Sequence, residues 1–564
     1  MHVSTTPVAS RDGDATKPAR NKNFYLMVIL ILLASGAVYG NALFNGFVHD
    51  DVPQVVNNTW IRDFRYIPQI FGANVWEFMG KVTTNYYRPL MHVMYTIDFH
   101  VFGLEPWGFH LVNILWHGGV SVLVFLVTER LLAKDNPLPR ISPNLSAFAV
   151  ALLFAVNPVH TEAVTWIAGF PELSFSLFYL LSVYYYIRAD EGKRGCATLS
   201  VAAFACATLC KETALTLPMI LFAYDITFRR TRGGIADHLR RWLPFVLVAG
   251  VYLALRVHVL KGFAPDIRHP ELNAYEYVIN VFPLFAQYLG KLLYPFDLNA
   301  FHVLHPIKSI FSPKGMISLA IAAAFIVGAG VAFKKSKVVF FGCVVAVVPL
   351  LPVFYIPGLG ENTFAERYLY LPSFGFILLT VLGIIWIMQR CNAVKAAAAA
   401  LTVVTVAYAA ATVDRNAVWK NNMTFWTDAV AKSPDGAIPH YNLGNNLTSQ
   451  GRIDEAIEQY RMAISLKPSV DEHYNLGRAY EMKGLAALAI EQYGQAVLLN
   501  PSNADSYTHL GFNYAMMGQL DKAVENLEMA IKLNPSDSLA RSNLAWVMGM
   551  KSGAAKSGGG RMKH

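Results

Sequence analysis

The sequence predicts an all-α chain in which a bundle of about eleven membrane-spanning helices precedes an array of helical repeats. Three observations support this fold class. Hydrophobic residues make up 54% of the 564 positions and charged residues only 15%, whereas soluble chains carry about 25% charged residues. Apolar runs long enough to cross a bilayer recur between residues 24 and 412. After residue 440 a motif returns every 33–34 residues, as in repeat proteins.

The chain begins with a polar and basic segment. Residues 1–23 contain few apolar side chains, and we expect them to form a disordered cytoplasmic N-terminus. The first apolar run, 24–44, is long enough to span and is followed by no evident cleavage site. It is therefore predicted to be an uncleaved anchor rather than a signal peptide.

A membrane domain is predicted over residues 24–413. The apolar runs lie at 24–44, 109–130, 145–160, 171–188, 196–210, 213–227, 242–260, 315–333, 337–356, 368–388 and 395–412. Six Lys/Arg clusters all fall on the cytoplasmic side if each of the eleven runs crosses the membrane. The N-terminus is then cytoplasmic, and the C-terminus lies on the outer side. Two weaker stretches, 88–103 and 276–298, are expected to be interfacial or re-entrant helices in the outer loops 45–108 and 261–314.

The distribution of charges and cysteines argues against nucleic-acid binding, a cysteine metal site and a disulfide framework. The net charge is +9, yet residues 414–549 hold 11 Lys/Arg against 15 Asp/Glu. The positive excess therefore belongs to the membrane domain and the tail, where it marks topology, and no nucleic-acid partner is expected. The five cysteines lie in or beside apolar runs without metal-type spacing or a disulfide framework.

The repeats occupy residues 414–549 and match the tetratricopeptide pattern. Aligned positions are Leu-Gly at 443–444, 476–477 and 510–511, then Ala at 456, 489 and 523, and Pro at 468, 501 and 535. Residues 421–434 are predicted to be the second helix of a degenerate first unit, and 536–549 a capping helix. Such arrays present a concave groove to extended peptides. Residues 550–564 are expected to be a flexible tail.

Ionisable residues gather on the predicted outer face. Asp50 and Asp51 follow the first span directly, and an ionised pair beside a bilayer is costly unless it is paired or does chemistry. Two like charges this close raise the pKa of one carboxyl, which suits a general base or a metal site. The same side receives His49, Arg88, His160, Glu162, Glu172, Lys211, Glu212, Glu366 and Arg367. This asymmetry predicts an active site or binding site at the outer leaflet.

These residue types suit transfer from a lipid phosphate. A carboxylate near an acceptor hydroxyl takes its proton, and a departing phosphate needs cations such as Arg367, Lys211 and Arg88. A structural role remains open for each of these cations. Arg367 could extend to the membrane interface at the start of a span, Lys211 could pair with Glu212, and Arg88 could start a helix.

A metal role also remains open from the sequence alone. His160 and Glu162 are candidates to join Asp50 and Asp51 around a divalent cation. Their spacing does not separate such a site from a hydrogen-bonded loop, so no cofactor is assigned.

Five short motifs in this order resemble one family. They are FVHDD at 47–51, YYRPL at 86–90, NPVHTEAVTWIAG at 157–169 followed by Glu172, CKETALTLP at 210–218 and AERYLYLPS at 365–373, all before the repeats. The chain resembles the transmembrane and tetratricopeptide-repeat (TMTC-type) O-mannosyltransferases of the GT-C glycosyltransferase superfamily. That resemblance implies a GT-C-type bundle and a helical first outer loop.

The resemblance implies transfer of a sugar, typically mannose, from a polyprenyl-phosphate donor to an acceptor hydroxyl, such as protein Ser/Thr, outside the cytoplasm. It implies that Asp50 is the base, that Asp51 orients acceptor or sugar, and that Arg367 and Lys211 lie near the phosphate. Arg88 joins them as a donor-phosphate candidate. Candidates for sugar or substrate contact are His49, His160, Glu162, Glu172, Glu212 and Glu366.

One departure concerns the second outer loop, where Gly169–Glu172 replaces the Arg- and Asp-containing run of animal members. The sugar identity therefore stays open. Only about three full repeats are present, so a different or shorter acceptor is expected. The small size and simple architecture favour a bacterial inner-membrane protein with periplasmic repeats, or the ER membrane in a eukaryote. The partners expected are the lipid-linked donor, membrane lipid and an acceptor peptide in the repeat groove.

Two alternatives to this function stay open. A lipid-linked oligosaccharide ligase or polymerase uses the same location but moves a whole glycan, so product mass separates the two. A membrane-anchored scaffold has no chemistry and loses all function without residues 417–564. A transporter fits less well because the polar residues cluster on one face and not at the bilayer midplane.

Overall fold

The computed structural model describes residues 22–80, 82–229, 235–266, 269, 271–359 and 363–558, and these residues form helices and loops without a strand. The all-α prediction is confirmed for this part of the chain. The predicted N-terminal segment 1–23 lies outside the described residues except for its last two positions.

Each of the eleven apolar runs falls on a helix. These helices are α1 Lys22–Tyr39, α4 Pro106–Lys134, α5 Pro143–Ala155, α7 Phe170–Asp190, α8 Cys196–Cys210, α9 Leu217–Phe228, α10 Ile235–Leu260, α12 Pro313–Lys335, α13 Lys337–Val347, α14 Tyr370–Arg390 and α15 Val394–Asn416. Within the described residues, eight helices are long and apolar enough to cross a membrane, or nine if a bent pair counts as one span.

The predicted count of eleven spans is not confirmed, and helix length explains the difference. A span needs about 20 apolar residues, whereas α8 has 15 and α9 has 12. Helix α5 stops at Ala155, and the chain turns by 50° before continuing through Pro158–Val164. Proline at the start of that second segment fits a break, because it cannot continue the hydrogen-bond ladder of the preceding helix.

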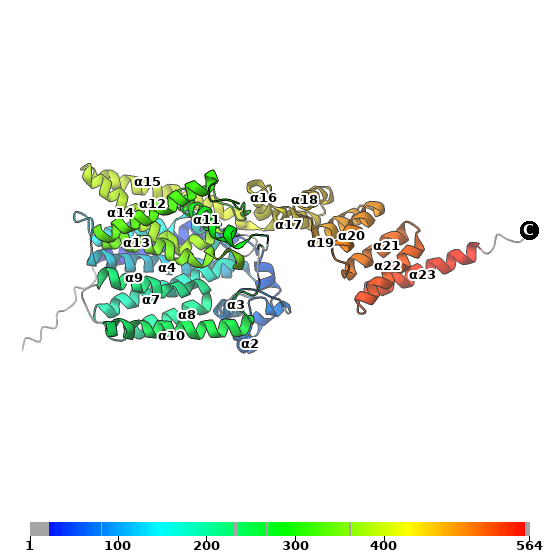
Figure 1. Cartoon of the computed structure of the whole chain (residues 1–564), viewed down its shortest axis with the longest axis horizontal. Coiled ribbons are helices and arrows are strands. Elements are labelled where there is room, and N and C mark those ends of the chain that lie inside the picture. Colours follow the sequence, from blue (N-terminus) through cyan, green and yellow to red (C-terminus); the bar gives the residue numbers. More distant parts are fainter. Residues whose placement is uncertain are drawn as a thin grey trace, which may run out of the picture.

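Three further helices flank the bundle: α2 Ile67–Phe71, α3 Pro89–Phe102 and α11 Ala274–Leu293. Helix α11 begins with a capping box, in which Asn273 and Glu276 satisfy each other's backbone N–H groups. Helices α3 and α11 correspond to the two stretches expected at the interface, and neither is among the candidate spans. In Figure 1, α2 and α3 lie at the end of the bundle from which the repeat helices extend.

Basic residues from two of the six Lys/Arg clusters, at 130–140 and 229–241, meet acidic residues at the end of α7. Lys134 Nζ lies 3.0 Å from Asp190 Oδ2, and Arg229 Nε lies 2.5 Å from Asp190 Oδ1. Arg130 Nη1 lies 2.9 Å from Glu191 Oε2. The ends of α4, α7 and α9 are therefore adjacent, as the shared side assigned to these clusters requires. The identity of that side as cytoplasmic remains a prediction.

The repeats form antiparallel helix pairs. Their helices are α16 Asn422–Lys432, α17 Ala437–Ser449, α18 Ile453–Leu466, α19 Val470–Met482, α20 Ala486–Leu499, α21 Ala504–Met516, α22 Leu520–Leu533 and α23 Ser538–Gly558. Helix α23 coincides with the expected capping helix and continues into the segment expected to be a flexible tail. The repeat architecture predicted from the 33–34-residue period is confirmed.

The repeat glycines allow close contact between paired helices. A Cβ atom added at Gly477 would lie 2.9 Å from the ring of Tyr493, which is fully buried. Gly494, a half-buried residue of α20, has no atom within 4 Å of an added Cβ.

We expect Gly477→Ala to lower the free energy of unfolding of the repeats by about 1–3 kcal/mol, because overpacking a filled site forces neighbours to move. The matched change Gly494→Ala should raise it by up to about 1 kcal/mol through helix propensity. Thermal unfolding of the two full-length variants checks this, and equal midpoints would contradict the packing role of Gly477.

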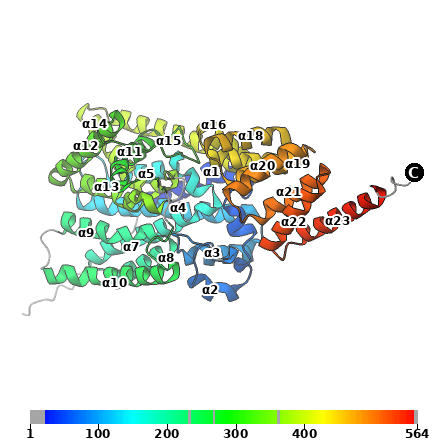
Figure 2. The ribbon, with the colours of Figure 1, turned by 45° about the vertical axis from the view of Figure 1, so that its right-hand side comes forward.

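The repeats are packed onto the membrane bundle through a common hydrophobic core. Val48, Trp166 and Ala168 of the outer loops belong to the same buried cluster as Trp419, Phe425 and Trp426, and this cluster continues through the repeats to Leu510. Figure 2 shows α16 against the bundle, with the later repeats extending away from it. The first repeat helix is thus an integral part of the outer face.

Candidate active site

Asp51 is a structural link between two outer loops. Its Oδ2 accepts a hydrogen bond from Val48 N at 2.9 Å, and its Oδ1 accepts one from Ala168 N at 2.7 Å. The side chain is only 1% exposed. Burial raises the pKa of this carboxyl well above its usual value, while the two N–H groups oppose the rise. Oδ2 therefore closes a turn within loop 45–51, and Oδ1 joins this loop to loop 166–168.

Asp50 points its carboxylate outward. Its side chain is 32% exposed, and its Oδ1 lies 3.6 Å from His49 Nε2. The adjacent His49 ring is stacked parallel to Trp166, with centroids 6.0 Å apart. Of the two predicted acidic residues, Asp50 is thus the one with a carboxylate accessible to another molecule.

The three cations predicted to bind phosphate each pair with a predicted carboxylate. Arg88 forms a bidentate pair with Glu212, with Nη2–Oε1 at 2.6 Å and Nε–Oε2 at 3.1 Å. Lys211 pairs with Glu172, and Arg367 pairs with Glu162. Six of the predicted site residues are thereby brought together, although Lys211 pairs with Glu172 and not with its neighbour Glu212.

Burial and charge act in opposite directions on two of these groups. Burial favours a higher pKa for Glu212, but the Arg88 guanidinium outweighs it and lowers that pKa to about 2. Burial lowers the pKa of Lys211, and the Glu172 carboxylate opposes this change. The Glu212 carboxylate is thus held in its charged form by Arg88.

Aromatic rings connect the ion pairs to the Asp50 loop. Lys211 Nζ lies 4.7 Å from the Tyr368 ring centroid, and Arg367 Cζ lies 4.9 Å from the same centroid. Arg367 Cζ also lies 5.4 Å from the centroid of Trp166, the residue on which His49 stacks. Cations over ring faces are attracted by the ring quadrupole. A continuous path of contacts therefore runs from Lys211 to Asp50.

A cavity of about 380 Å³ opens beside Tyr368. Its polar lining residues include Lys211, Glu212 and Arg256. The remaining lining is mainly apolar and includes Leu215, Leu253, Phe263, Pro352, Val353 and Leu359. A mainly apolar lining that also contains cationic groups suits a lipid that carries a phosphate.

Arg256 was not among the residues predicted from the sequence. It lies near the end of α10, is 7% exposed, and donates from Nη2 to Asn85 O at 2.7 Å. Its Nη1 is buried and has no hydrogen-bond partner among the described residues. The available signal was an arginine inside the apolar run 242–260, since ionisable residues in spans are rarely without a function.

A second cavity of about 270 Å³ adjoins the first. The two share Asn85, Tyr86, Gly358 and Leu359 as lining residues. The second cavity also reaches Pro53, which follows Asp51 by two positions. The site therefore has one hollow at the cations and another toward the loop that carries the acidic pair.

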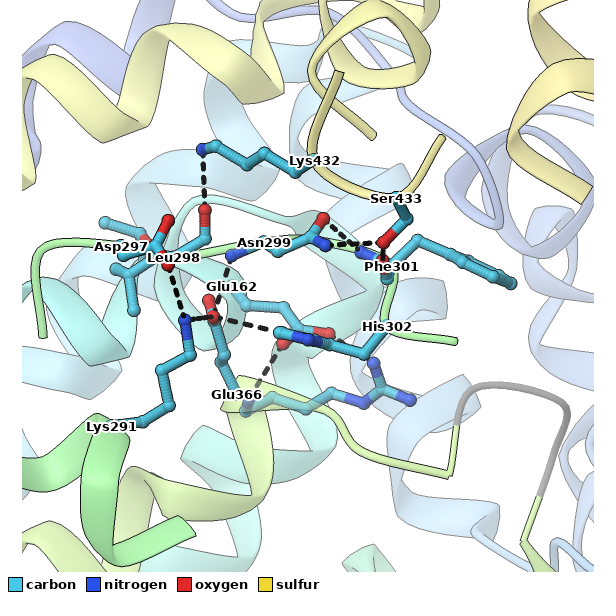
Figure 3. Close-up of polar contacts among 12 residues, drawn as sticks. Glu162, Lys291, Asp297, Leu298, Asn299, Phe301, His302, Glu366, Lys432 and Ser433 are labelled. Carbon is cyan, nitrogen blue, oxygen red and sulfur yellow. Dashed lines mark hydrogen bonds and ion pairs between the residues drawn. The ribbon is translucent and has the colours of Figure 1, made fainter. Parts of the chain in front are cut away.

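Glu366 holds in place the loop that contains Asn299 and His302 (Figure 3). Its Oε1 accepts a hydrogen bond from Asn299 N at 2.7 Å and lies 3.3 Å from His302 Nε2 and 3.8 Å from Lys291 Nζ. Asn299 Nδ2 in turn donates to Ser433 Oγ at 2.8 Å. Glu366 is only 1% exposed. The structure thus places this predicted sugar contact between the outer loop and the start of the repeats.

His160 lies apart from the acidic pair. Its Nε2 is 2.7 Å from Ser373 Oγ, and its ring packs against Phe154 and Tyr370. Glu162 faces Arg367, and Asp51 faces backbone N–H groups. Within the described part of the chain, no group of three His, Cys, Asp or Glu residues is arranged to hold a metal. The cation site considered for these four residues is therefore not assembled here.

Comparisons with known proteins agree with both halves of the chain. A TPR repeat family model matches residues 444–484, and a tetratricopeptide repeat model matches 473–503 and 504–537. Human "Protein O-mannosyl-transferase TMTC1" is 28% identical over 533 residues and covers 83% of this chain. The mouse protein named TMTC3 is 27% identical over 482 residues and covers 78%. Over most of its length, this chain is similar to proteins named TMTC.

The chain spans only part of the length of these relatives. It spans 58% of human TMTC1, 51% of mouse TMTC3 and 56% of Drosophila melanogaster Tmtc3, to which it is 26% identical over 531 residues. Among solved structures, the crystal structure of MamA is 27% identical, covers 23% of this chain and 77% of MamA, and has a TM-score of 0.23. The resemblance seen in the five sequence motifs is thus confirmed over most of the chain.

Proposed function

We propose that this chain is a membrane glycosyltransferase of the GT-C type that moves one sugar from a polyprenyl-phosphate donor to an acceptor hydroxyl. The relatives' names favour mannose as the sugar and protein as the acceptor. The observation that supports this most is the 380 Å³ cavity, whose lining combines apolar side chains with Lys211 and Arg256, together with the partly exposed carboxylate of Asp50. We propose a bacterial inner membrane as the setting, with the repeats in the periplasm, or the ER membrane in a eukaryote.

In this proposal, the lipid-linked donor occupies the 380 Å³ cavity beside Tyr368. Its first isoprene units contact Leu215, Leu253 and Phe263, and its phosphate lies at the end formed by Lys211 and Arg256. Negative charge accumulates on the phosphate as its bond to the sugar breaks, and cations placed in advance in a dry site stabilise that charge. Arg256 supplies a guanidinium nitrogen that no described group already occupies.

The acceptor approaches from the Asp50 side. Asp50 removes the hydroxyl proton as the acceptor oxygen bonds to the anomeric carbon, and the polyprenyl phosphate leaves with the electron pair of the broken bond. Asp51 positions this loop through Val48 and Ala168. The 270 Å³ cavity gives the acceptor side chain a route to the reacting carbon, and the repeats hold the rest of an extended peptide.

The ion pairs set how strongly each cation acts on the donor. Arg88, Lys211 and Arg367 are each balanced by a carboxylate, so an incoming phosphate competes with that partner. A charge-assisted hydrogen bond contributes about 1.5–3 kcal/mol. Arg256 interacts electrostatically with Glu212 but forms no ion pair with a carboxylate among the described residues, and we expect it to contribute most to donor affinity.

Arg256→Gln should raise the donor KM by roughly 10-fold to 100-fold, since one charge-assisted bond is lost. The control is Arg241→Gln, which changes an arginine near the other end of the same helix, beside Asp190. Initial rates at increasing donor concentration separate the two variants. Equal donor KM values would remove Arg256 from the phosphate site.

The function itself is tested with purified protein in nanodiscs. Radiolabelled polyprenyl-phosphate-mannose is supplied with an extract of extracytoplasmic proteins, and labelled protein is analysed by mass. Addition of a single hexose supports the proposal. Addition of many sugars from an oligosaccharide donor would indicate the ligase or polymerase, and no transfer from any lipid-linked sugar would favour the scaffold.

A further inference from the structure

His49 has a backbone conformation that needs outside support. Its φ is +54°, in the left-handed region that residues other than glycine rarely adopt. Its N–H donates to Asn422 Oδ1 at 2.7 Å, across 373 positions of sequence. Asn422 is the first residue of α16. A helix assigned to the repeats by sequence thus fixes the residue that precedes Asp50.

The His49 ring is held in an aromatic slot built from both halves of the chain. Trp166 stacks on it at 12° and Phe425 at 20°, with centroids 6.0 and 5.7 Å away. Trp426 meets it edge-on at 5.1 Å. The slot directs Nε2 toward Asp50 Oδ1, 3.6 Å away. Two of the three rings that set this direction belong to α16.

The rest of the loop is fixed from the same two sides. Gly46 N donates to Lys420 O at 2.9 Å, and Asn45 Nδ2 donates to Asn416 O at 3.1 Å. On the other side, Trp166 Nε1 donates to Val48 O at 3.2 Å. Loop 45–51 is therefore clamped between residues 416–426 and the second outer loop.

We propose that the start of the repeat domain acts through Asn422, Phe425 and Trp426 as a positioning element of the active site, which holds His49 and thereby sets the place of Asp50. This inference rests on the proposed function, in which Asp50 is the base. The repeats then do more than bind the acceptor, because α16 belongs to the repeat array and also supports the loop that carries Asp50.

The test compares two substitutions at one position. Asn422→Ala removes the oxygen that accepts the His49 N–H, whereas Asn422→Asp keeps an acceptor oxygen in its place. We expect Asn422→Ala to lower kcat by roughly 10-fold to 100-fold with the donor KM unchanged, because small misplacements of a reacting group cost this much. Asn422→Asp should retain kcat near that of the unaltered chain.

The matched control is Asn421→Ala. Asn421 caps α16 by accepting from Thr424 N at 3.0 Å, so this change weakens the same helix without removing the His49 contact. We expect its kcat to be retained although its thermal midpoint falls. An equal loss of kcat in Asn421→Ala and Asn422→Ala would mean that helix integrity alone matters, and it would overturn the positioning role.

A second readout does not depend on turnover. Hydrogen–deuterium exchange of a peptide that covers residues 45–51 should accelerate in Asn422→Ala, and it should not change in Asn422→Asp or Asn421→Ala. Unchanged exchange in Asn422→Ala overturns the inference even if no donor is turned over. An active chain that loses activity in Asp50→Asn but not in Asn422→Ala keeps the proposed function and rejects only this inference.

Discussion

Asp50→Asn should reduce sugar transfer by roughly 10²-fold to 10⁴-fold, the contribution that a positioned general base makes. The amide has nearly the shape of the carboxylate but cannot accept the proton. Because this side chain is 32% exposed and contacts chiefly His49, the substitution should leave the thermal midpoint within about 1 °C of the unaltered chain. Rates of label transfer and thermal unfolding of the same preparation check both parts.

Asp51→Asn is the informative comparison because the structure gives the neighbouring carboxylate a different role. Its two oxygens accept from Val48 N and Ala168 N inside the protein, so the amide must point its NH₂ group at one of these donors. We expect lower stability together with partial loss of activity. A stable Asp51→Asn chain without activity, alongside an active Asp50→Asn chain, would exchange the roles assigned to the two residues.

Lys211→Met should lower the free energy of unfolding by about 3–5 kcal/mol, the cost of leaving a buried charge without its partner. Lys211 and Glu172 form an ion pair with side chains 3% and 4% exposed. Removal of the ammonium group leaves the buried Glu172 carboxylate without its partner. Denaturant unfolding in a fixed detergent measures the change.

The double variant Lys211→Met/Glu172→Leu is the control for this effect. It replaces the pair by apolar side chains of similar length, and such exchanges are often neutral or stabilising. We therefore expect it to recover most of the stability that the single change removes, while transfer activity stays low. A single variant as stable as the double one would show that the pair is hydrated and not buried.

The fold was predictable where periodicity and length carry the information. Leu-Gly, Ala and Pro at a constant interval specified the repeats, and apolar runs specified the helices of the bundle. The number of membrane spans could not be predicted from the apolar runs, because α8 and α9 are short and α5 ends at a 50° turn. Run length alone does not show where a helix breaks against its neighbours.

The site was predictable in its residue types and less so in its contacts. The outer loops brought Arg88, Lys211 and Arg367 together with their carboxylates, but the choice of partner depends on packing between loops far apart in sequence. Arg256 was missed because it lies inside an apolar run. The link from α16 to His49 joins positions 373 apart, and a single sequence gives no signal for such a contact.

The central claim is that a sugar passes from a lipid phosphate to an acceptor at Asp50. The most direct test measures two products in the same reaction: labelled sugar on the acceptor and free polyprenyl phosphate. The account predicts equal molar amounts from the unaltered chain and neither product above background from Asp50→Asn. Release of lipid phosphate without labelled acceptor, or equal products from the two chains, would contradict it.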